Sequence, residues 1–260
     1  MFGTTTTMIT FEHPVNEQVR LYLRLEHLFQ EFNHSMALNK NESKASLFTL
    51  LKIVNVVDRP DLKSKLVQLL TLHMVTLGNL QASPNIDTIR LQEILSKLRE
   101  HIHYLHQHSG KFGEELRQNE FLNQIRLHMS NPAGACETML PAFQLWLNGH
   151  AEERFCDLES WHKPFTELKR TIDLLLSLIR QSAQPQKVIA PDGFYQQSLD
   201  PNMPPELIQI ILPVELGLYP ECSANKHRLL IRFLKPDFYQ GGRPTQSSND
   251  IPFEIKFCRI

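Results

Sequence analysis

Over the first 180 residues the apolar positions recur three or four residues apart, which is the spacing of one face of an α-helix. Pro14 is typical of a first helical position, and the pattern after it predicts a helix of about five turns. The predicted inward face of this helix comprises Val15, Val19, Tyr22, Leu25, Leu28, Phe29 and Phe32.

The same spacing predicts further helices along this part of the chain. They cover residues 47–57, 62–77, 91–105, about 115–129, and 164–179, with a short helical or mixed piece at 140–147. In the segment 91–105 the apolar steps alternate between four and three, as in a heptad seam. Two heptads are too short to require a coiled coil, so packing inside a helix bundle explains the seam.

After about residue 185 the sequence pattern changes: prolines and glycines become frequent, and the apolar runs shorten to strand length. Strands are predicted at 187–190, 207–214, 227–234 and 252–260, and the N-terminal TTTTMITF is also β-prone. Helices followed by strands indicate the α+β class. We expect a helical bundle domain over 14–184 and a smaller, mainly antiparallel β domain formed by 185–260 and the strand in 1–13.

Composition limits the possible functions. The 260 residues include 27 basic and 28 acidic side chains, so the general basic excess of a nucleic-acid binder is missing. The four cysteines are scattered without a CxxC pair, no secretory signal precedes the first helix, and the longest apolar run is far too short to span a membrane. We expect a protein of a reducing compartment, most simply the cytoplasm.

The motifs that would indicate an enzyme are weak or missing. HIHYLHQH at 101–108 has no i, i+4 histidine pair and no nearby acidic or cysteine ligand, so a solvated helix end explains it better than a metal site. The sequence contains no G-x-S-x-G, phosphate loop or G-x-G-x-x-G. We therefore expect a protein that is not an enzyme and needs no cofactor or metal.

One predicted strand has an unusual outer face. In NKHRLLIRFL (225–234) the alternation of a strand places Leu229, Ile231 and Phe233 on one face and Lys226, Arg228 and Arg232 on the other. The nearest acids in sequence are Glu221 before and Asp237 after. This face is either a solvated outer face, or the face of an edge strand whose charges prevent aggregation. The alternative is a docking face for an acidic segment, whose carboxylates accept two hydrogen bonds from each arginine.

Several long blocks of the chain resemble the ZapD family of bacterial division proteins. They are FEHPVNEQVRLYLRLEHLF (11–29), SNPAGACETMLPAFQLWL (130–147), LLSLIRQSA (175–183), GFYQ (193–196) and LYPECSANKHRLLIRF (218–233). Their order and approximate spacing cover nearly the whole chain.

The resemblance implies a non-enzymatic homodimer, joined through its helical part, that acts at the division ring at mid-cell. It implies binding to the C-terminal tail of FtsZ and bundling of FtsZ filaments in support of septation. The family's basic patch matches Arg228 and Arg232 here, with Lys226 beside them. Its helical half departs at Glu120, where the family has a basic residue, so Arg117 and Arg126 are the candidates for that half. Gln144 stands where some relatives carry histidine.

Two other function classes remain as alternatives. A metal-dependent hydrolase would use the histidine-rich helix end, and a stoichiometric metal would support it. A nucleic-acid-binding module would use the basic strand face, and salt-dependent binding to DNA would support that interpretation.

Overall fold

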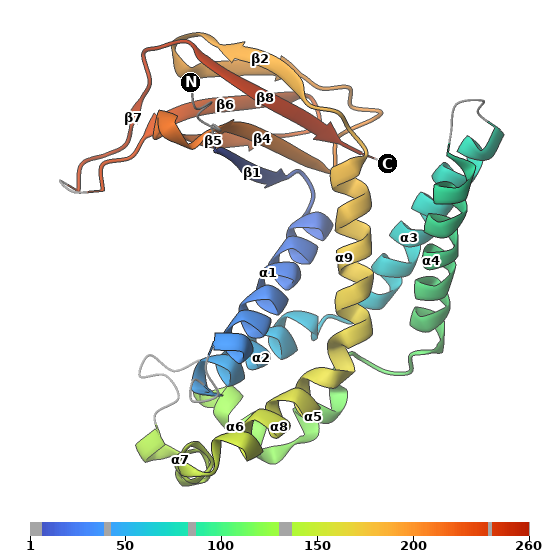
Figure 1. Ribbon diagram of the computed structural model, residues 1–260, viewed down its shortest axis with the longest axis vertical. Coiled ribbons are helices and arrows are strands. Elements are labelled where there is room, and N and C mark those ends of the chain that lie inside the picture. The colour runs from blue at the N-terminus through green and yellow to red at the C-terminus, as the bar shows by residue number, and fades with distance from the viewer. Residues whose placement is uncertain (1–6, 39–42, 83–86, 130–136, 239–240, 260) are drawn as a thin grey trace, which may run out of the picture. The chain divides into compact units, whose positions relative to one another are not determined.

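A computed structural model describes residues 7–38, 43–82, 87–129, 137–238 and 241–259. The chain forms two compact units (Figure 1), one of residues 22–175 and one of residues 1–21 with 176–260. We call them the helical unit and the β unit, and each is described by itself. The observed α+β class is the one that the sequence predicts.

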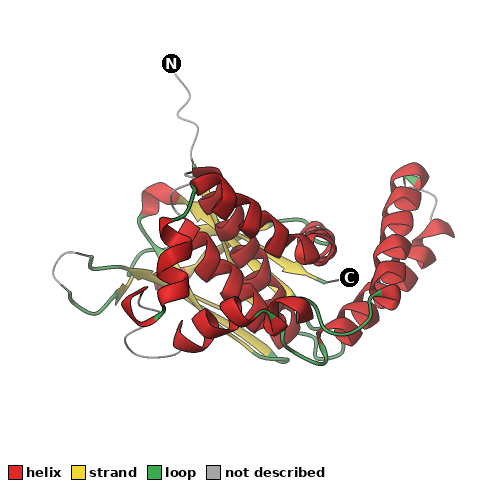
Figure 2. Cartoon of the chain, turned by 90° about the horizontal axis from the view of Figure 1, so that it is seen from below, coloured by secondary structure: helices red, strands yellow, loops and turns green. Residues whose placement is uncertain are grey.

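The helical unit is built from amphipathic helices around a core of leucine, isoleucine and aromatic side chains. Helices α3 and α4 lie side by side (Figure 1 and Figure 2). Helices α1 and α9 each continue into the β unit. The helices are α1 (Glu17–Leu38), α2 (Ser43–Val57), α3 (Leu62–Asn79), α4 (Thr88–Gln107), α5 (Glu114–Gln118), α6 (Glu120–Met129), α7 (Pro141–Asn148), α8 (Ala151–His162) and α9 (Thr166–Gln181). No helix in the described part of the chain combines the length and the apolar character needed to cross a membrane.

The start of α1 differs from the prediction. Pro14 ends a strand rather than beginning the helix, and Val15 packs against the core of the β unit. Asn16 is the cap instead, because its side-chain oxygen accepts a hydrogen bond from the backbone N–H of Val19 at 2.8 Å.

The predicted helix at about 115–129 is two helices. Asn119 interrupts it with extended backbone, and its side-chain oxygen accepts from the backbone N–H of Leu122 at 3.0 Å, which caps α6. Helix α8 was not predicted, because its many charged residues obscure the apolar spacing. The SNPAGA segment (130–135) and the first threonines lie outside the described residues.

The β unit contains two antiparallel sheets. The first has the strand order β1-β4-β8-β2, and the second has the order β3-β6-β5, with β7 pairing β6. The strands are β1 (Met8–Pro14), β2 (Gln186–Ala190), β3 (Phe194–Ser198), β4 (Leu207–Pro213), β5 (Tyr219–Ala224), β6 (Arg228–Lys235), β7 (Thr245–Gln246) and β8 (Ile251–Cys258). The prediction that the N-terminal strand joins the C-terminal strands is confirmed, since β1 pairs with β4.

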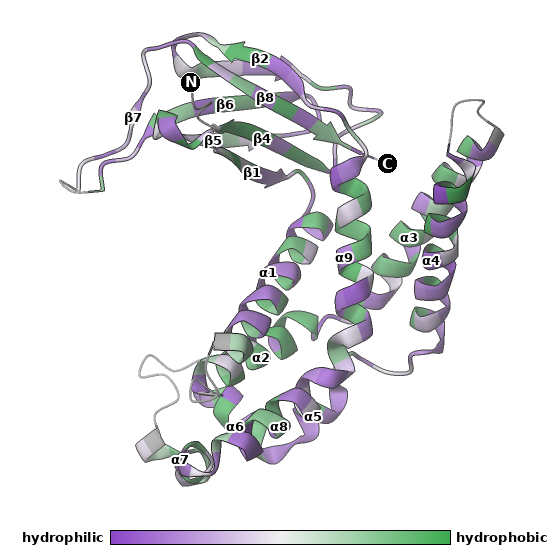
Figure 3. Ribbon diagram, viewed as in Figure 1, coloured by the Kyte–Doolittle hydropathy of each residue, from purple (hydrophilic) through white to green (hydrophobic). Residues whose placement is uncertain are grey.

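Alternating side chains of the two sheets form one shared core. Figure 3 shows hydrophobic and hydrophilic positions interleaved along β8. From β4, β6 and β8 this core receives Ile208, Ile210, Leu212, Leu229, Ile231, Phe233, Ile251, Phe253 and Ile255.

Strands β3 and β5 were not predicted, because glutamine, serine and proline interrupt their apolar alternation. In GFYQ (193–196), Gly193 belongs to a turn and Phe194 begins β3. Gly193 has a φ of +68°, and a Cβ there would stand 2.6 Å from the Ser247 carbonyl oxygen, so the turn requires glycine.

Candidate partner-binding site

The outward side of the β3-β6-β5 sheet carries the predicted basic residues. Leu229, Ile231 and Phe233 on β6 are fully buried, so the alternation turns Arg228 and Arg232 to the opposite, exposed side. Both arginines are exposed, as the sequence predicts. We call Lys226, Arg228 and Arg232 the strand patch.

Arg232 differs from the prediction because it has an acidic neighbour. The register of β5 and β6 places Glu221 directly opposite Arg232, and the guanidinium Nη2 lies 2.5 Å from the carboxylate Oε2. The two side chains are 56% and 52% exposed. An ion pair this open to water contributes only about 0–1 kcal/mol, so its arginine remains available for exchange with another carboxylate.

Lys226 lies just before β6, not on it. It occupies the turn between β5 and β6, where Asn225 accepts hydrogen bonds from the backbone N–H groups of His227 at 2.8 Å and of Arg228 at 2.9 Å. Among the described residues, neither Lys226 nor Arg228 has a side-chain partner. Lys226 also lines a cavity of about 560 Å³ together with Glu206 and Arg259.

The two helical candidates surround one carboxylate in the helical unit. The Lys111 ammonium donates to Asp58 at 2.9 Å, and the Arg117 Nε lies 3.8 Å from the same oxygen. The hydrogen bond from Lys111, with the charges of Arg117 and Arg126 adding to it, lowers the pKa of Asp58 against the opposing effect of burial. We call Asp58, Lys111, Arg117 and Arg126 the Asp58 cluster.

Arg117 and Arg126 are held much more firmly than the strand arginines. The Arg117 side chain is only 13% exposed. Arg126 donates to Asn55 at 3.2 Å and to Asn123 at 2.7 Å. The structure thus brings Arg117 and Arg126 together around Asp58, while Arg228 and Arg232 share the sheet face of the other unit. Glu120 is exposed and accepts from Gln124 at 2.9 Å.

The histidine-rich end of α4 is only half solvated. His103 and His106 are exposed, whereas His101 makes a 2.9 Å hydrogen bond with Thr171, and His108 stacks on Phe112 with ring centroids 4.5 Å apart. Burial lowers the pKa of both His101 and His108, so the expectation of a solvated helix end is correct only for His103 and His106. In the described part of the chain no three histidine, cysteine or acidic side chains gather as metal ligands would.

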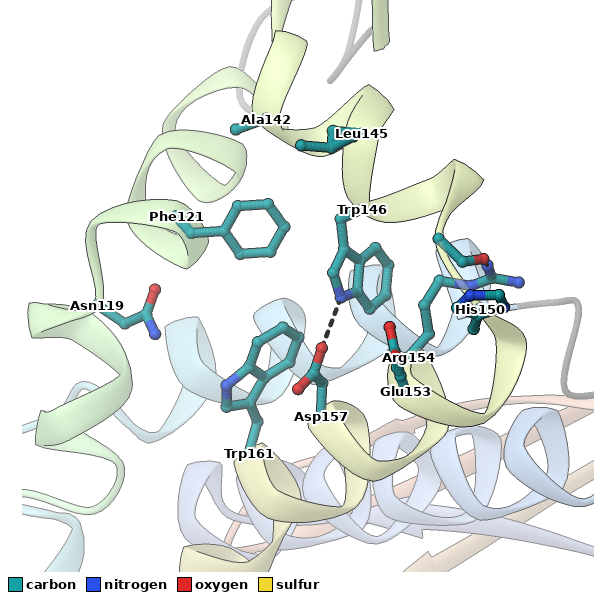
Figure 4. Close-up of a pocket in the computed structure, with 11 residues that line it drawn as sticks. Asn119, Phe121, Ala142, Leu145, Trp146, His150, Glu153, Arg154, Asp157 and Trp161 are labelled. Atoms are coloured by element: carbon teal, nitrogen blue, oxygen red, sulfur yellow. Dashed lines mark hydrogen bonds between the residues drawn. The ribbon is translucent and has the colours of Figure 1, made fainter.

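The sequence interpretation missed a cavity of about 570 Å³ in the helical unit (Figure 4). Phe121, Trp146 and Trp161 line it, with ring centroids 5.8–6.0 Å apart. The Trp146 indole N–H donates to the Asp157 carboxylate at 2.9 Å. The three aromatic residues come from three different helices, so no local spacing pattern could have grouped them.

Comparison with known proteins places the chain in a family. A family model described as "ZapD: Cell division protein" matches residues 23–232. A cell division protein ZapD of Coxiella burnetii is 46% identical over 98% of this chain and 99% of its own length. One of Cupriavidus taiwanensis is 37% identical over 97% of this chain and 100% of its own length. With the helical unit, the two antiparallel sheets and the strand patch in place, this chain belongs to the ZapD family of cell division proteins.

Proposed function

We propose that this protein binds the C-terminal tail of FtsZ through the strand patch and, as a homodimer, crosslinks and bundles FtsZ filaments to promote assembly of the division ring. Its place of action is then the cytoplasmic ring at mid-cell. The observation that carries the proposal is the pair of exposed arginines, four residues apart in sequence, on the outward side of β6. The proposal requires no catalytic step and no cofactor.

The patch suits an extended acidic or mixed-charge peptide. Arg228 and Arg232 lie on the same side of one strand with a single residue of that side between them, a separation of roughly 13 Å. Guanidinium groups fork carboxylates with two hydrogen bonds, which fixes the peptide as well as attracting it. Leu230 between them is partly buried and supplies apolar contact.

The Asp58 cluster is proposed as a weaker, second basic region. Three cations around one carboxylate leave it net positive, although its arginines are tied to Asp58, Asn55 and Asn123. We expect the cluster to attract the tail at long range rather than to bind its carboxylates directly. Arg117 is nearly buried, and Arg126 would have to leave Asn55 and Asn123.

Dimerisation is assigned to the α3–α4 hairpin of the helical unit. Leu72 and Val75 on α3 and Ile89 on α4 are exposed apolar residues of this hairpin, and contact with a second copy would remove them from water. Two tail sites per dimer and many tails per filament raise the effective concentration, so weak sites produce firm bundling. The double variant Leu72→Asp with Val75→Asp is expected to be monomeric in analytical ultracentrifugation and to bind tails without bundling filaments.

The deciding experiment is co-sedimentation of FtsZ filaments with this protein at low and at high salt. FtsZ lacking its C-terminal tail is run beside the intact protein. We expect bundling that requires the tail and weakens with salt, because exposed charges are screened. Bundling of tail-less FtsZ would contradict the proposed site, and no bundling of intact FtsZ would contradict the proposed function.

A matched pair of variants tests the patch itself. Arg228→Glu combined with Arg232→Glu should lose tail binding. Lys187→Glu, an exposed charge reversal on β2 of the other sheet, should keep it.

A further inference from the structure

The cavity of the helical unit combines an aromatic wall with negative charge. Phe121 from α6, Trp146 from α7 and Trp161 from α8 form the wall, and in Figure 4 their rings lie around the Asp157 carboxylate. Glu153, one helical turn before Asp157 on α8, lines the same cavity. We call these five residues the aromatic pocket.

The negative charge of the pocket is only partly offset within the described chain. Asp157 accepts a hydrogen bond from the neutral Trp146 indole, and neither Asp157 nor Glu153 makes an ion pair with a described residue. Arg154 also lines the cavity, but it is only 7% exposed and its guanidinium donates to the Ser43 hydroxyl and to the Gly149 carbonyl. Both acceptors are neutral, so the charge of Arg154 offsets one of the two carboxylates and the lining keeps a net charge of −1.

This combination selects the charge of a ligand. An anion would be repelled by both carboxylates. A neutral apolar group would remove water from the Asp157 carboxylate and offer it no hydrogen bond in return, which costs free energy. A cation is attracted to the faces of tryptophan and phenylalanine when it lies within about 6 Å of the ring centroids. It is also paired by the carboxylate.

Arginine fits better than a compact ammonium. Its planar guanidinium stacks on an aromatic ring while its edge donates two hydrogen bonds to a carboxylate, and the pocket offers both partners side by side. The volume of about 570 Å³ exceeds that of one guanidinium, and Leu145 at the rim is exposed, so apolar residues flanking the arginine have a contact as well.

We propose that the aromatic pocket is a docking site for an arginine side chain presented by a short peptide segment of a partner protein. This site is separate from the strand patch and has the opposite charge preference. It does not depend on the proposed FtsZ tail binding.

The chain contains its own reporter for this test. Its sequence has two tryptophans, and both line the pocket, so intrinsic fluorescence reports on this site. The full-length protein is titrated with the peptide acetyl-Leu-Arg-Leu-amide and, in parallel, with the same peptide carrying citrulline, which has nearly the shape of arginine but no charge. We expect a saturable fluorescence change with the arginine peptide and an affinity lower by at least about tenfold for the citrulline peptide.

Variants then assign the effect to the carboxylate. Asp157→Asn keeps an oxygen that can accept from Trp146 but removes the charge, so it should weaken the arginine peptide by about tenfold. It should leave the already weak citrulline peptide unchanged. Glu159→Gln, an exposed acid on the same helix outside this cavity, is the matched control and should bind as the unaltered protein does. Circular dichroism confirms that each variant is folded.

Three results would overturn the proposal. The first is equal affinity for the arginine and citrulline peptides, and the second is the absence of any saturable response in the unaltered protein. The third is a tryptophan spectrum that shifts with protein concentration alone, which would mean that a second copy of the chain covers the pocket. None of these outcomes bears on binding to FtsZ, because that test uses the strand patch variants.

Discussion

The strand patch and the Asp58 cluster are built from the same residue type and differ in how the fold holds it. On β6, Arg228 has no side-chain partner in the described chain, and Arg232 has one that is half exposed. In the helical unit, Arg117 is nearly buried beside Asp58, and Arg126 is held by two asparagines. The difference is the reason why we propose the strand patch, and not the Asp58 cluster, as the main docking site.

Energetics give this difference a scale. Breaking the exposed pair of Arg232 and Glu221 costs about 0–1 kcal/mol, and a carboxylate from a partner can compensate for it. Withdrawing Arg126 from Asn55 and Asn123 leaves partly buried polar groups unsatisfied, and one such group costs about 1–3 kcal/mol. The arginines of the sheet are therefore the better candidates for docking, and those of the helices mainly contact their own unit.

The largest effect is expected from reversing the exposed charges. Arg228→Glu with Arg232→Glu should reduce affinity for an FtsZ tail peptide by more than about 100-fold, since two attractive contacts become repulsive. Fluorescence anisotropy with a labelled tail peptide measures the loss. The melting temperature should stay nearly constant because both side chains point into water. Unchanged affinity in the folded variant would contradict the proposed difference between the strand patch and the Asp58 cluster.

Removing a buried arginine should show the opposite profile. Arg117→Ala is expected to destabilise the protein by about 2 kcal/mol, measured by urea unfolding, because Asp58 loses a neighbouring cation and aliphatic packing is lost. Affinity for the FtsZ tail peptide should fall only a few-fold, because the Asp58 cluster loses one positive charge and attracts the tail less strongly. A loss of tail binding as large as that of the strand variant, with stability unchanged, would place Arg117 in direct contact with the tail.

Acid should weaken the helical unit through His162. Burial, with the Lys169 charge adding to it, lowers the pKa of His162 to about 4, and its ring stacks on Phe32 with centroids 4.4 Å apart. Between its ordinary pKa of 6.5 and about 4 the unfolded chain binds the proton and the folded chain does not, so stability falls as pH falls through this window. His162→Phe keeps the stacking and should remove about 1–2 kcal/mol of that loss. Chemical unfolding at a series of pH values measures it.

Glu206 in the β unit provides a control of opposite sign. Burial raises its pKa to about 7 from 4.5, so the folded state keeps a proton that the unfolded state has released, and stability falls as pH rises through this window. Glu206→Gln should flatten that slope without altering the fall in stability at acid pH, to which His162 and the buried His73 both contribute. If His162→Phe and Glu206→Gln changed the same part of the curve of stability against pH, the assignment of these two groups would be wrong.

The smallest effect is expected at Glu221. Glu221→Gln frees Arg232 from its cross-strand partner and should strengthen tail binding by about two- to threefold, since an exposed pair is worth well under 1 kcal/mol. Isothermal titration at low salt is sensitive enough to detect it. A weaker affinity would mean that the pair positions Arg232 instead of competing for it.

Sequence pattern was sufficient for features that depend on neighbours along the chain. The two-residue period of β6 predicted which side is buried and which side carries Arg228 and Arg232. The apolar face of α9 was read correctly for the same reason, since Leu168, Ile172 and Leu175 follow helical spacing and are fully buried. Strands β3 and β5 were missed where polar residues break the alternation.

Contacts between distant segments could not be predicted in this way. The pairing of Glu221 with Arg232 follows from strand register, and the grouping of Lys111, Arg117 and Arg126 around Asp58 follows from helix packing. The aromatic pocket likewise unites residues from α6, α7 and α8. Period and composition report which way a side chain faces, because backbone geometry is local. Which charge it meets, and how freely it can leave that charge, depends on segments that come together only when the hydrophobic cores form.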